Sequence, residues 1–167
     1  MSMQIYYILC FQEQCAKRLL TVRATINSLL QFGLIPILLS CAFEISPLCN
    51  MDCKMCYVRM TKQEMNKVGR QRTVDEWIEI AEQAKEMGTL FILLTGGEPF
   101  LYKDFKELYI KLYNMGFILS INTNATLITE KEVEWLKKHK PMKVNVTLYG
   151  DCNETYERLC NNPKGFE

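Results

Sequence analysis

The regular spacing of short apolar runs constrains the fold of this chain more than any other feature. Three runs, at residues 90–95, 117–121 and 143–148, begin roughly 27 residues apart, and residues 42–46 form a similar run before them. Strands separated by this length of chain form βα units, with parallel strands and right-handed crossovers. The sequence therefore predicts an α/β fold with four βα units.

Helix signals occupy the intervals between these runs. Capping patterns begin three expected helices: Thr73 with Glu76, Asp104 with Glu107, and Thr129 with Glu132. Apolar residues follow at helical spacing, and we expect Leu108, Leu112, Val133 and Leu136 to face the core. Helix capping accounts for Asp104. A last helix is expected within residues 153–159.

Polar and cysteine-rich segments directly follow the expected strands. These segments are residues 49–56, 96–99, 122–124 and 149–153. The carboxyl ends of parallel strands meet at one edge of a sheet, and that edge carries the active site in barrels and open α/β folds. We therefore expect these four segments to form one site.

Three cysteines in the first segment indicate a metal site. Cys49, Cys53 and Cys56 have the spacing C-x3-C-x2-C. Structural zinc sites and fully protein-ligated iron–sulfur clusters use four protein ligands, so three thiolates leave one metal position open. This pattern favours an iron–sulfur cluster with an open iron. One alternative is a zinc site with a fourth ligand, for which the candidates are Cys41, Cys152, Cys160 and His139. The other alternative is a set of buried thiols that bind no metal.

Charge and cysteine usage restrict the surroundings of the protein. The formal net charge is +1, so no basic field predicts binding to nucleic acid. The apolar run at residues 29–43 is short for a membrane span and is interrupted by Pro36, so no membrane partner is expected. Eight cysteines without a recognisable signal peptide favour a reducing, cytoplasmic location. Residues 1–38 form an N-terminal segment of unclear role.

Taken together, the motifs resemble those of the radical S-adenosylmethionine (radical SAM) superfamily. The resemblance rests on C-x3-C-x2-C after the first strand and GGEP after the second, and it extends over about residues 39–167. The segments INTNAT and VNVTLYG are similar to the branch that carries a SPASM extension and modifies peptides. The resemblance implies the N-terminal part of a partial (βα)6 TIM-like barrel, truncated after its first units. We accordingly expect an N-terminal fragment that is incomplete as an enzyme on its own.

The resemblance also implies the chemistry. Cys49, Cys53 and Cys56 would hold a 4Fe–4S cluster, and S-adenosylmethionine would chelate the fourth iron. Reductive cleavage of S-adenosylmethionine would give a 5′-deoxyadenosyl radical that abstracts hydrogen from a peptide or protein substrate. A flavodoxin or ferredoxin would donate the electron. The alternative function is a non-catalytic iron–sulfur or zinc-binding module, a degenerate remnant of such an enzyme.

The same resemblance assigns cofactor-binding candidates residue by residue. These are Gly96, Gly97, Glu98, Pro99, Asn122, Asn124, Thr147 and Tyr57. The glycines would let backbone carbonyls approach the ligand, and Glu98 would either attract the methionine ammonium or hold the loop. For Asn122, Asn124 and Thr147, turn capping and strand-edge hydrogen bonding are the alternatives.

The chain departs from the family pattern at two positions. Met55 stands before the third cysteine, where an aromatic residue is usual, and Tyr57 follows that cysteine. Cys160 stands at the nearest match to a position where related proteins often have arginine, and Arg158 is displaced from it.

Overall fold

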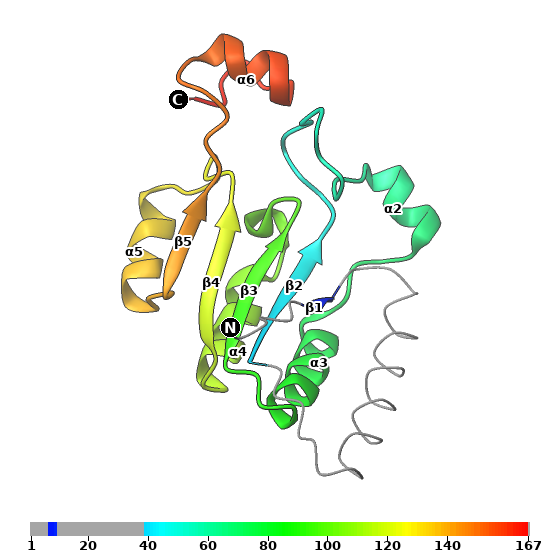
Figure 1. The fold of residues 1–167 in the computed structure, drawn as a ribbon, viewed down its shortest axis with the longest axis vertical. Helices are drawn as coiled ribbons and strands as arrows, with labels where there is room; N and C mark the ends of the chain where they lie inside the picture. Colours follow the sequence, from blue (N-terminus) through cyan, green and yellow to red (C-terminus); the bar gives the residue numbers. More distant parts are fainter. Residues whose placement is uncertain (1–6, 10–38, 167) are drawn as a thin grey trace, which may run out of the picture.

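The chain forms one sheet of parallel strands with helices packed against it (Figure 1). The computed structural model describes residues 7–9 and 39–166. The strands, in their spatial order, are β1 (Tyr7–Leu9), β2 (Ser40–Ser46), β3 (Phe91–Gly96), β4 (Ile118–Thr123) and β5 (Lys143–Val146). Each neighbouring pair is parallel. The predicted α/β fold class is therefore confirmed.

Helices connect the strands of this sheet. They are α2 (Lys62–Val68), α3 (Val74–Glu86), α4 (Phe105–Asn114), α5 (Glu130–Lys138) and α6 (Asn153–Cys160), with a short 3-10 helix η1 at Pro99–Leu101. The four predicted strands correspond to β2 to β5, although β5 ends at Val146 rather than at residue 148. The sequence reading did not predict β1, which pairs with β2 and lies within the N-terminal segment. The rest of residues 1–38, including most of the apolar run at 29–43, lies outside the described residues.

Local capping accounts for where the helices begin. The predicted capping boxes form at Thr73 for α3 and at Thr129 for α5. A third box, in which Thr61 pairs with Glu64, begins α2, a helix that the sequence reading did not predict. The capping role predicted for Asp104 is wrong: it occupies the N-cap position of α4, but its side chain makes no capping hydrogen bond.

The main core lies between the sheet and helices α3 and α4. Phe43 of β2 stacks on Trp77 of α3 with ring centroids 5.1 Å apart. Leu108 and Leu112 of α4 are fully buried, as predicted. The inward orientation predicted for Val133 is wrong, because α5 packs onto α4 through Trp135 instead.

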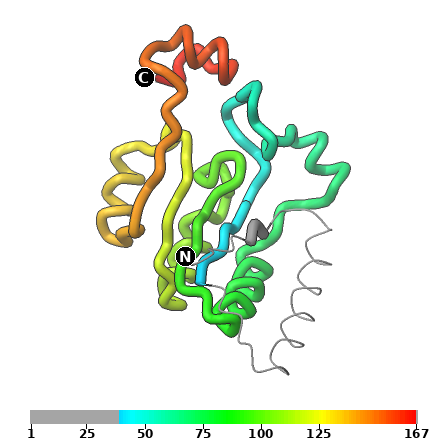
Figure 2. Tube along the Cα trace, in the orientation of Figure 1, coloured from blue at the N-terminus to red at the C-terminus, as the bar shows by residue number. Residues whose placement is uncertain are grey.

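The carboxyl ends of the strands carry the longer loops and α6 (Figure 2). The loop after β2 and the segment after β5, which are more than 90 residues apart in the chain, extend beyond this edge and meet there. Among the described residues, no helix has the length and apolar character needed to cross a membrane.

Candidate metal and cofactor site

The structure places the four polar segments at the same edge of the sheet (Figure 1). Residues 49–56 follow β2, residues 96–99 begin at the last residue of β3, residues 122–124 span the end of β4, and residues 149–153 follow β5 and reach the first residue of α6. Parallel pairing brings the carboxyl ends of the strands together. The predicted meeting of these segments at one edge is therefore confirmed as geometry.

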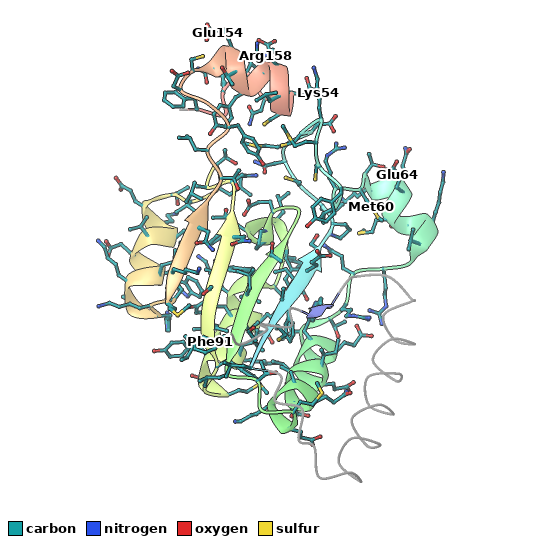
Figure 3. The ribbon with its side chains drawn as sticks, viewed as in Figure 1. Lys54, Met60, Glu64, Phe91, Glu154 and Arg158 are labelled. Carbon is teal, nitrogen blue, oxygen red and sulfur yellow. The ribbon has the colours of Figure 1, made fainter. Side chains whose placement is uncertain are left out.

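Backbone hydrogen bonds to α6 hold the cysteine loop, defined as residues 49–56. Asp52 N donates to Cys160 O and Lys54 N donates to Leu159 O, each at 2.9 Å. The last carbonyls of a helix have no partner within the helix, so an external donor stabilises its end. Figure 3 shows Lys54 at the tip of the loop, near the helix that carries Arg158. Cys53 lies between the two donating residues, and its position is fixed from both sides.

A small apolar cluster lies beneath this contact. Met51, Tyr156 and Cys160 are buried together, and Cys49, Cys53, Tyr149 and Leu159 pack against them. Burial and then a hydrogen bond with Cys53 raise the pKa of the Cys160 thiol to about 12. The same two causes, in the same order, raise the pKa of Tyr149. The sequence reading did not identify Met51 or Tyr156 as part of the site.

Amide groups point at two of the three cysteine sulfurs. Met51 N donates to Cys49 Sγ at 3.4 Å, and Arg59 N donates to Cys56 Sγ at 3.3 Å. The Asn124 side chain donates to Cys49 Sγ at 3.6 Å. The pKa of Cys49 is raised, chiefly by burial, and the hydrogen bond from Met51 offsets part of that rise. N–H donors favour anionic thiolates, the form in which cysteine binds metal.

The donor set fits a cluster in which each cysteine binds a different iron. In residues 7–9 and 39–166, no three His, Cys, Asp or Glu side chains are grouped so that they could hold one metal ion. Ligands to different irons need not converge on one point. Cys160 packs against the cysteine loop, whereas the other three candidates for a fourth zinc ligand lie elsewhere: Cys41 in β2, Cys152 before α6, and His139 at the end of α5.

The two glycines after β3 allow close contact with the chain itself. A Cβ on Gly97 would lie 2.3 Å from Leu48 O, and one on Gly96 would lie 2.3 Å from Ser46 O. Gly97 N also donates to Ser46 O at 2.8 Å. The backbone leading into the cysteine loop therefore already requires glycine at both positions, and their contact with the ligand stays a prediction.

Glu98 joins the loop after β3 to the end of β4. Its side chain is 0% exposed and accepts hydrogen bonds from Phe100 N at 3.1 Å, Thr123 Oγ1 at 2.8 Å and Asn124 N at 2.8 Å. These bonds show that Glu98 holds the loop, and its contact with the methionine ammonium stays a prediction. Pro99 follows at the first position of η1 and is buried.

Asn124 connects the end of β4 to the cysteine loop. Its Nδ2 donates to Asn50 Oδ1 at 2.9 Å, and Asn50 Nδ2 donates to Thr126 Oγ1 at 2.7 Å. Thr126 Oγ1 in turn donates to Asn124 Oδ1 at 2.7 Å. Asn50 and Thr123 were missed as site residues; a polar residue inside the cysteine motif was the only available signal for Asn50.

The remaining cofactor-binding candidates are Asn122, Thr147 and Tyr57. Asn122 Oδ1 accepts from Asn145 Nδ2 at 2.7 Å, which is a bond across the β4–β5 pair. Thr147 lies just past β5 with an exposed side chain, and its N donates to Thr123 O at 3.2 Å. The Tyr57 side chain is 87% exposed. Their roles as cofactor ligands stay predictions.

Comparison with known proteins shows which family the chain matches. The model of the Radical SAM superfamily matches residues 43–167. The chain is 27% identical over 129 residues to the sporulation killing factor maturation protein SkfB of Bacillus subtilis, covering 77% of this chain and 30% of that protein. It is 28% identical over 112 residues to the PqqA peptide cyclase of Bradyrhizobium diazoefficiens, covering 67% of this chain and 29% of the cyclase.

A solved structure supports the fold. Streptococcus suis SuiB bound to S-adenosylmethionine aligns with a TM-score of 0.67 at 24% identity, covering 92% of this chain and 35% of SuiB. The chain thus spans about a third of the length of the proteins it matches.

Proposed function

Because this chain belongs to the radical SAM superfamily, we propose that residues 39–167 are the core of an enzyme that binds a 4Fe–4S cluster and cleaves S-adenosylmethionine. Cys49, Cys53 and Cys56 would hold the cluster. The cluster would supply an electron to the sulfonium of S-adenosylmethionine, giving a 5′-deoxyadenosyl radical that abstracts hydrogen from the substrate.

The observation that carries this proposal is the anchored cysteine loop. Its sulfurs lie at the carboxyl edge of a parallel sheet, amide donors face Cys49 and Cys56, and α6 holds the segment around Cys53. That the three cysteines share one loop held at this edge supports their role as cluster ligands. The chain supplies three cysteines in the loop, so one iron would remain for S-adenosylmethionine.

The other residues at the edge would position the ligand. Glu98 fixes the turn after β3 relative to β4, so the backbone of residues 96–98 is held in place for the methionine group. Asn124 contacts both Cys49 and Asn50 and would stand between cluster and ligand. Asn122, Thr147 and Tyr57 would contact the ribose, the carboxylate or the adenine as the ligand closes the site.

The proposed substrate class is a peptide or protein. Its support is the names of two relatives, a killing-factor maturation protein and a peptide cyclase. A flavodoxin or ferredoxin is the proposed electron donor. The proposed location is the cytoplasm, and its support is that the cysteines in residues 39–166 are free thiols.

Metal analysis tests the proposal. Anaerobic reconstitution with iron and sulfide should give a brown protein, and Cys49→Ala, Cys53→Ala and Cys56→Ala should each lose most of the iron. Cys152→Ala is the matched control, because Cys152 bonds to Thr155 at 3.3 Å and lies outside the cysteine loop. Full iron content in Cys53→Ala would contradict the proposal.

One observation favours a second candidate, a non-catalytic metal module. Cys160 is buried in the cluster that Cys53 packs against, so it is the candidate fourth thiolate of a zinc site, which would require the three loop cysteines to move together on binding. Metal content of the purified chain separates the two candidates. A colourless protein with zinc that Cys160→Ala abolishes would favour the module.

A further inference from the structure

Positive charge is concentrated in the α2 segment, which we define as residues 59–72. The segment contains five Lys or Arg residues and one acidic residue, Glu64, whereas the whole chain contains 20 and 19. Helix α3, which follows the segment, has the opposite balance, with five acidic residues and one lysine. The α2 segment is therefore a local basic region in a chain whose formal net charge is only +1.

Contacts at both ends hold the α2 segment beside the cysteine loop. At its start, the Arg59 guanidinium forms an ion pair with Asp52 of the cysteine loop at 2.9 Å. At its end, the Gln71 side chain donates a hydrogen bond to Ser46 Oγ, at the last residue of β2. Figure 3 shows Met60 near the end of β2, where the chain enters the segment. The segment thus begins and ends at the carboxyl edge of the sheet.

Between these two contacts, helix α2 extends into solvent. Figure 1 shows α2 beyond the end of β2 and apart from α3, α4 and α5. Every residue from 61 to 70 is exposed except Met65. Within the part of the chain that the structure describes, no carboxylate lies within ion-pair distance of Lys62 or Lys67. These two ammonium groups and the exposed side chain of Val68 are accessible to a partner.

We propose that the α2 segment is the docking surface for an acidic one-electron carrier protein, with Lys62 and Lys67 as its main charged contacts. This inference rests on the proposed function, in which the cluster receives an electron from outside the chain. The carrier loses one electron, the cluster gains it, and no covalent bond changes at the surface. A basic surface attracts an acidic carrier and orients it before contact.

The position of the surface favours an electron carrier over other acidic partners. Electron transfer is fast only over short distances, so a carrier must dock close to a cluster ligand. Cys56 is exposed, whereas Cys49 and Cys53 are half-buried. Cys56 Sγ accepts a hydrogen bond at 3.3 Å from the backbone of Arg59, the first residue of the α2 segment. The exposed side of the proposed cluster therefore adjoins the basic surface.

The rate at which a reduced flavodoxin reduces the cluster of the reconstituted chain tests the inference. Anaerobic stopped-flow absorbance measures this rate. In the double variant Lys62→Glu with Lys67→Glu, we expect the second-order rate constant to fall about tenfold at low salt, because the surface would repel an acidic protein. Added salt should lower the rate of the parent but not that of the variant. Dithionite, a small reductant that needs no docking surface, should reduce both clusters to the same extent.

A matched pair of lysines on α5 provides the control. Lys131 and Lys138 are exposed near the start and the end of that helix, and within residues 39–166 neither has an ion-pair partner. Helix α5 precedes β5, at the opposite end of the sheet from β1. Lys131→Glu with Lys138→Glu should therefore keep the parent rate. Lys62→Gln with Lys67→Gln removes the two charges without reversing them and should lower the rate less than the glutamate pair does.

Equal rates in the parent and in the Lys62→Glu, Lys67→Glu variant, with full iron content in both, would overturn this inference and leave the proposed function standing. A parent cluster that dithionite reduces and flavodoxin does not would have the same meaning. If the variant loses binding to phosphatidylserine vesicles while flavodoxin still reduces it at the parent rate, the surface binds a membrane and the inference is overturned. Absence of iron from the parent chain would overturn the inference together with the proposed function.

Discussion

Thr123 donates its hydroxyl to both carboxylate oxygens of Glu98, at 2.8 and 3.0 Å, across the ends of strands β4 and β3. Both side chains are buried. The bond joins two of the four loops of the candidate site. It determines how the turn at residues 96–99 lies against the segment that contains Asn124.

Glu98→Gln should destabilise the protein, because the amide nitrogen of glutamine would face N–H and O–H groups whose hydrogen bonds the carboxylate now accepts. Leaving a buried donor unpaired costs about 1–3 kcal/mol, and we expect a loss of about 2 kcal/mol in the free energy of unfolding. Urea denaturation measures it. Glu79→Gln, at an exposed position of α3, is the control. Equal stability of the two variants would refute the structural role of Glu98.

Gly97→Ala should affect both folding and metal binding. The added Cβ would lie 2.3 Å from Leu48 O, so the backbone before Cys49 must move. Overpacking of this kind typically costs about 1–3 kcal/mol. We expect a lower melting temperature together with reduced iron uptake. A variant that keeps the parent's stability and iron content would show that the contact with Leu48 is unimportant.

Ala125→Gly should stabilise the protein. Ala125 has φ 64°, a left-handed conformation that disfavours a side chain. Relief of that strain exceeds the entropy cost of glycine, and a net gain of about 0.5 kcal/mol is expected. Ala84→Gly in helix α3 is the matched control and should lose stability. Denaturation midpoints that fall in both variants would argue against this account of the turn.

Acid should weaken the N-terminus of α3. A hydrogen bond from Arg70, and next one from Thr73 N, lower the pKa of Glu76 to about 2 from 4.5. A depressed carboxyl pKa stabilises the fold above about pH 4.5, and this contribution is lost as the pH falls towards 2. Melting temperatures between pH 7 and pH 2 should fall less steeply in Glu76→Gln than in the parent. The difference will be modest, because Arg70 is exposed. If the melting temperatures of the parent and of Glu76→Gln fall equally with pH, Glu76 makes no such contribution.

The sequence predicted those parts of the fold that depend on local signals. Thr73 and Thr129 begin their helices where capping boxes predict them, and the apolar runs became β2 to β5. The three-residue strand β1 was missed because so short a strand leaves no pattern of alternation. The predicted inward orientation of Val133 was wrong because α5 contacts α4 through Trp135. The spacing of apolar residues within a single helix does not reveal which face contacts a neighbouring helix.

The sequence predicted where the candidate site lies but not the hydrogen bonds that join its residues. Parallel βα units bring their loops to one edge, so spacing alone located the cysteine loop near residues 96–99 and 122–124. Contacts between distant residues could not be read from the sequence. The bond from Asn124 to Asn50 spans 74 residues, and the docking of the cysteine loop on Cys160 joins the first and last βα units.

The central claim is that three cysteines leave one iron of the cluster for S-adenosylmethionine. Electron paramagnetic resonance of the reduced, reconstituted chain with S-adenosylmethionine labelled with nitrogen-15 at its amino group tests it directly. The account predicts hyperfine coupling between the cluster and the label, and loss of the signal in Cys53→Ala. A cluster that forms fully but shows no coupling would mean that the fourth iron is occupied by the protein, and would contradict the account.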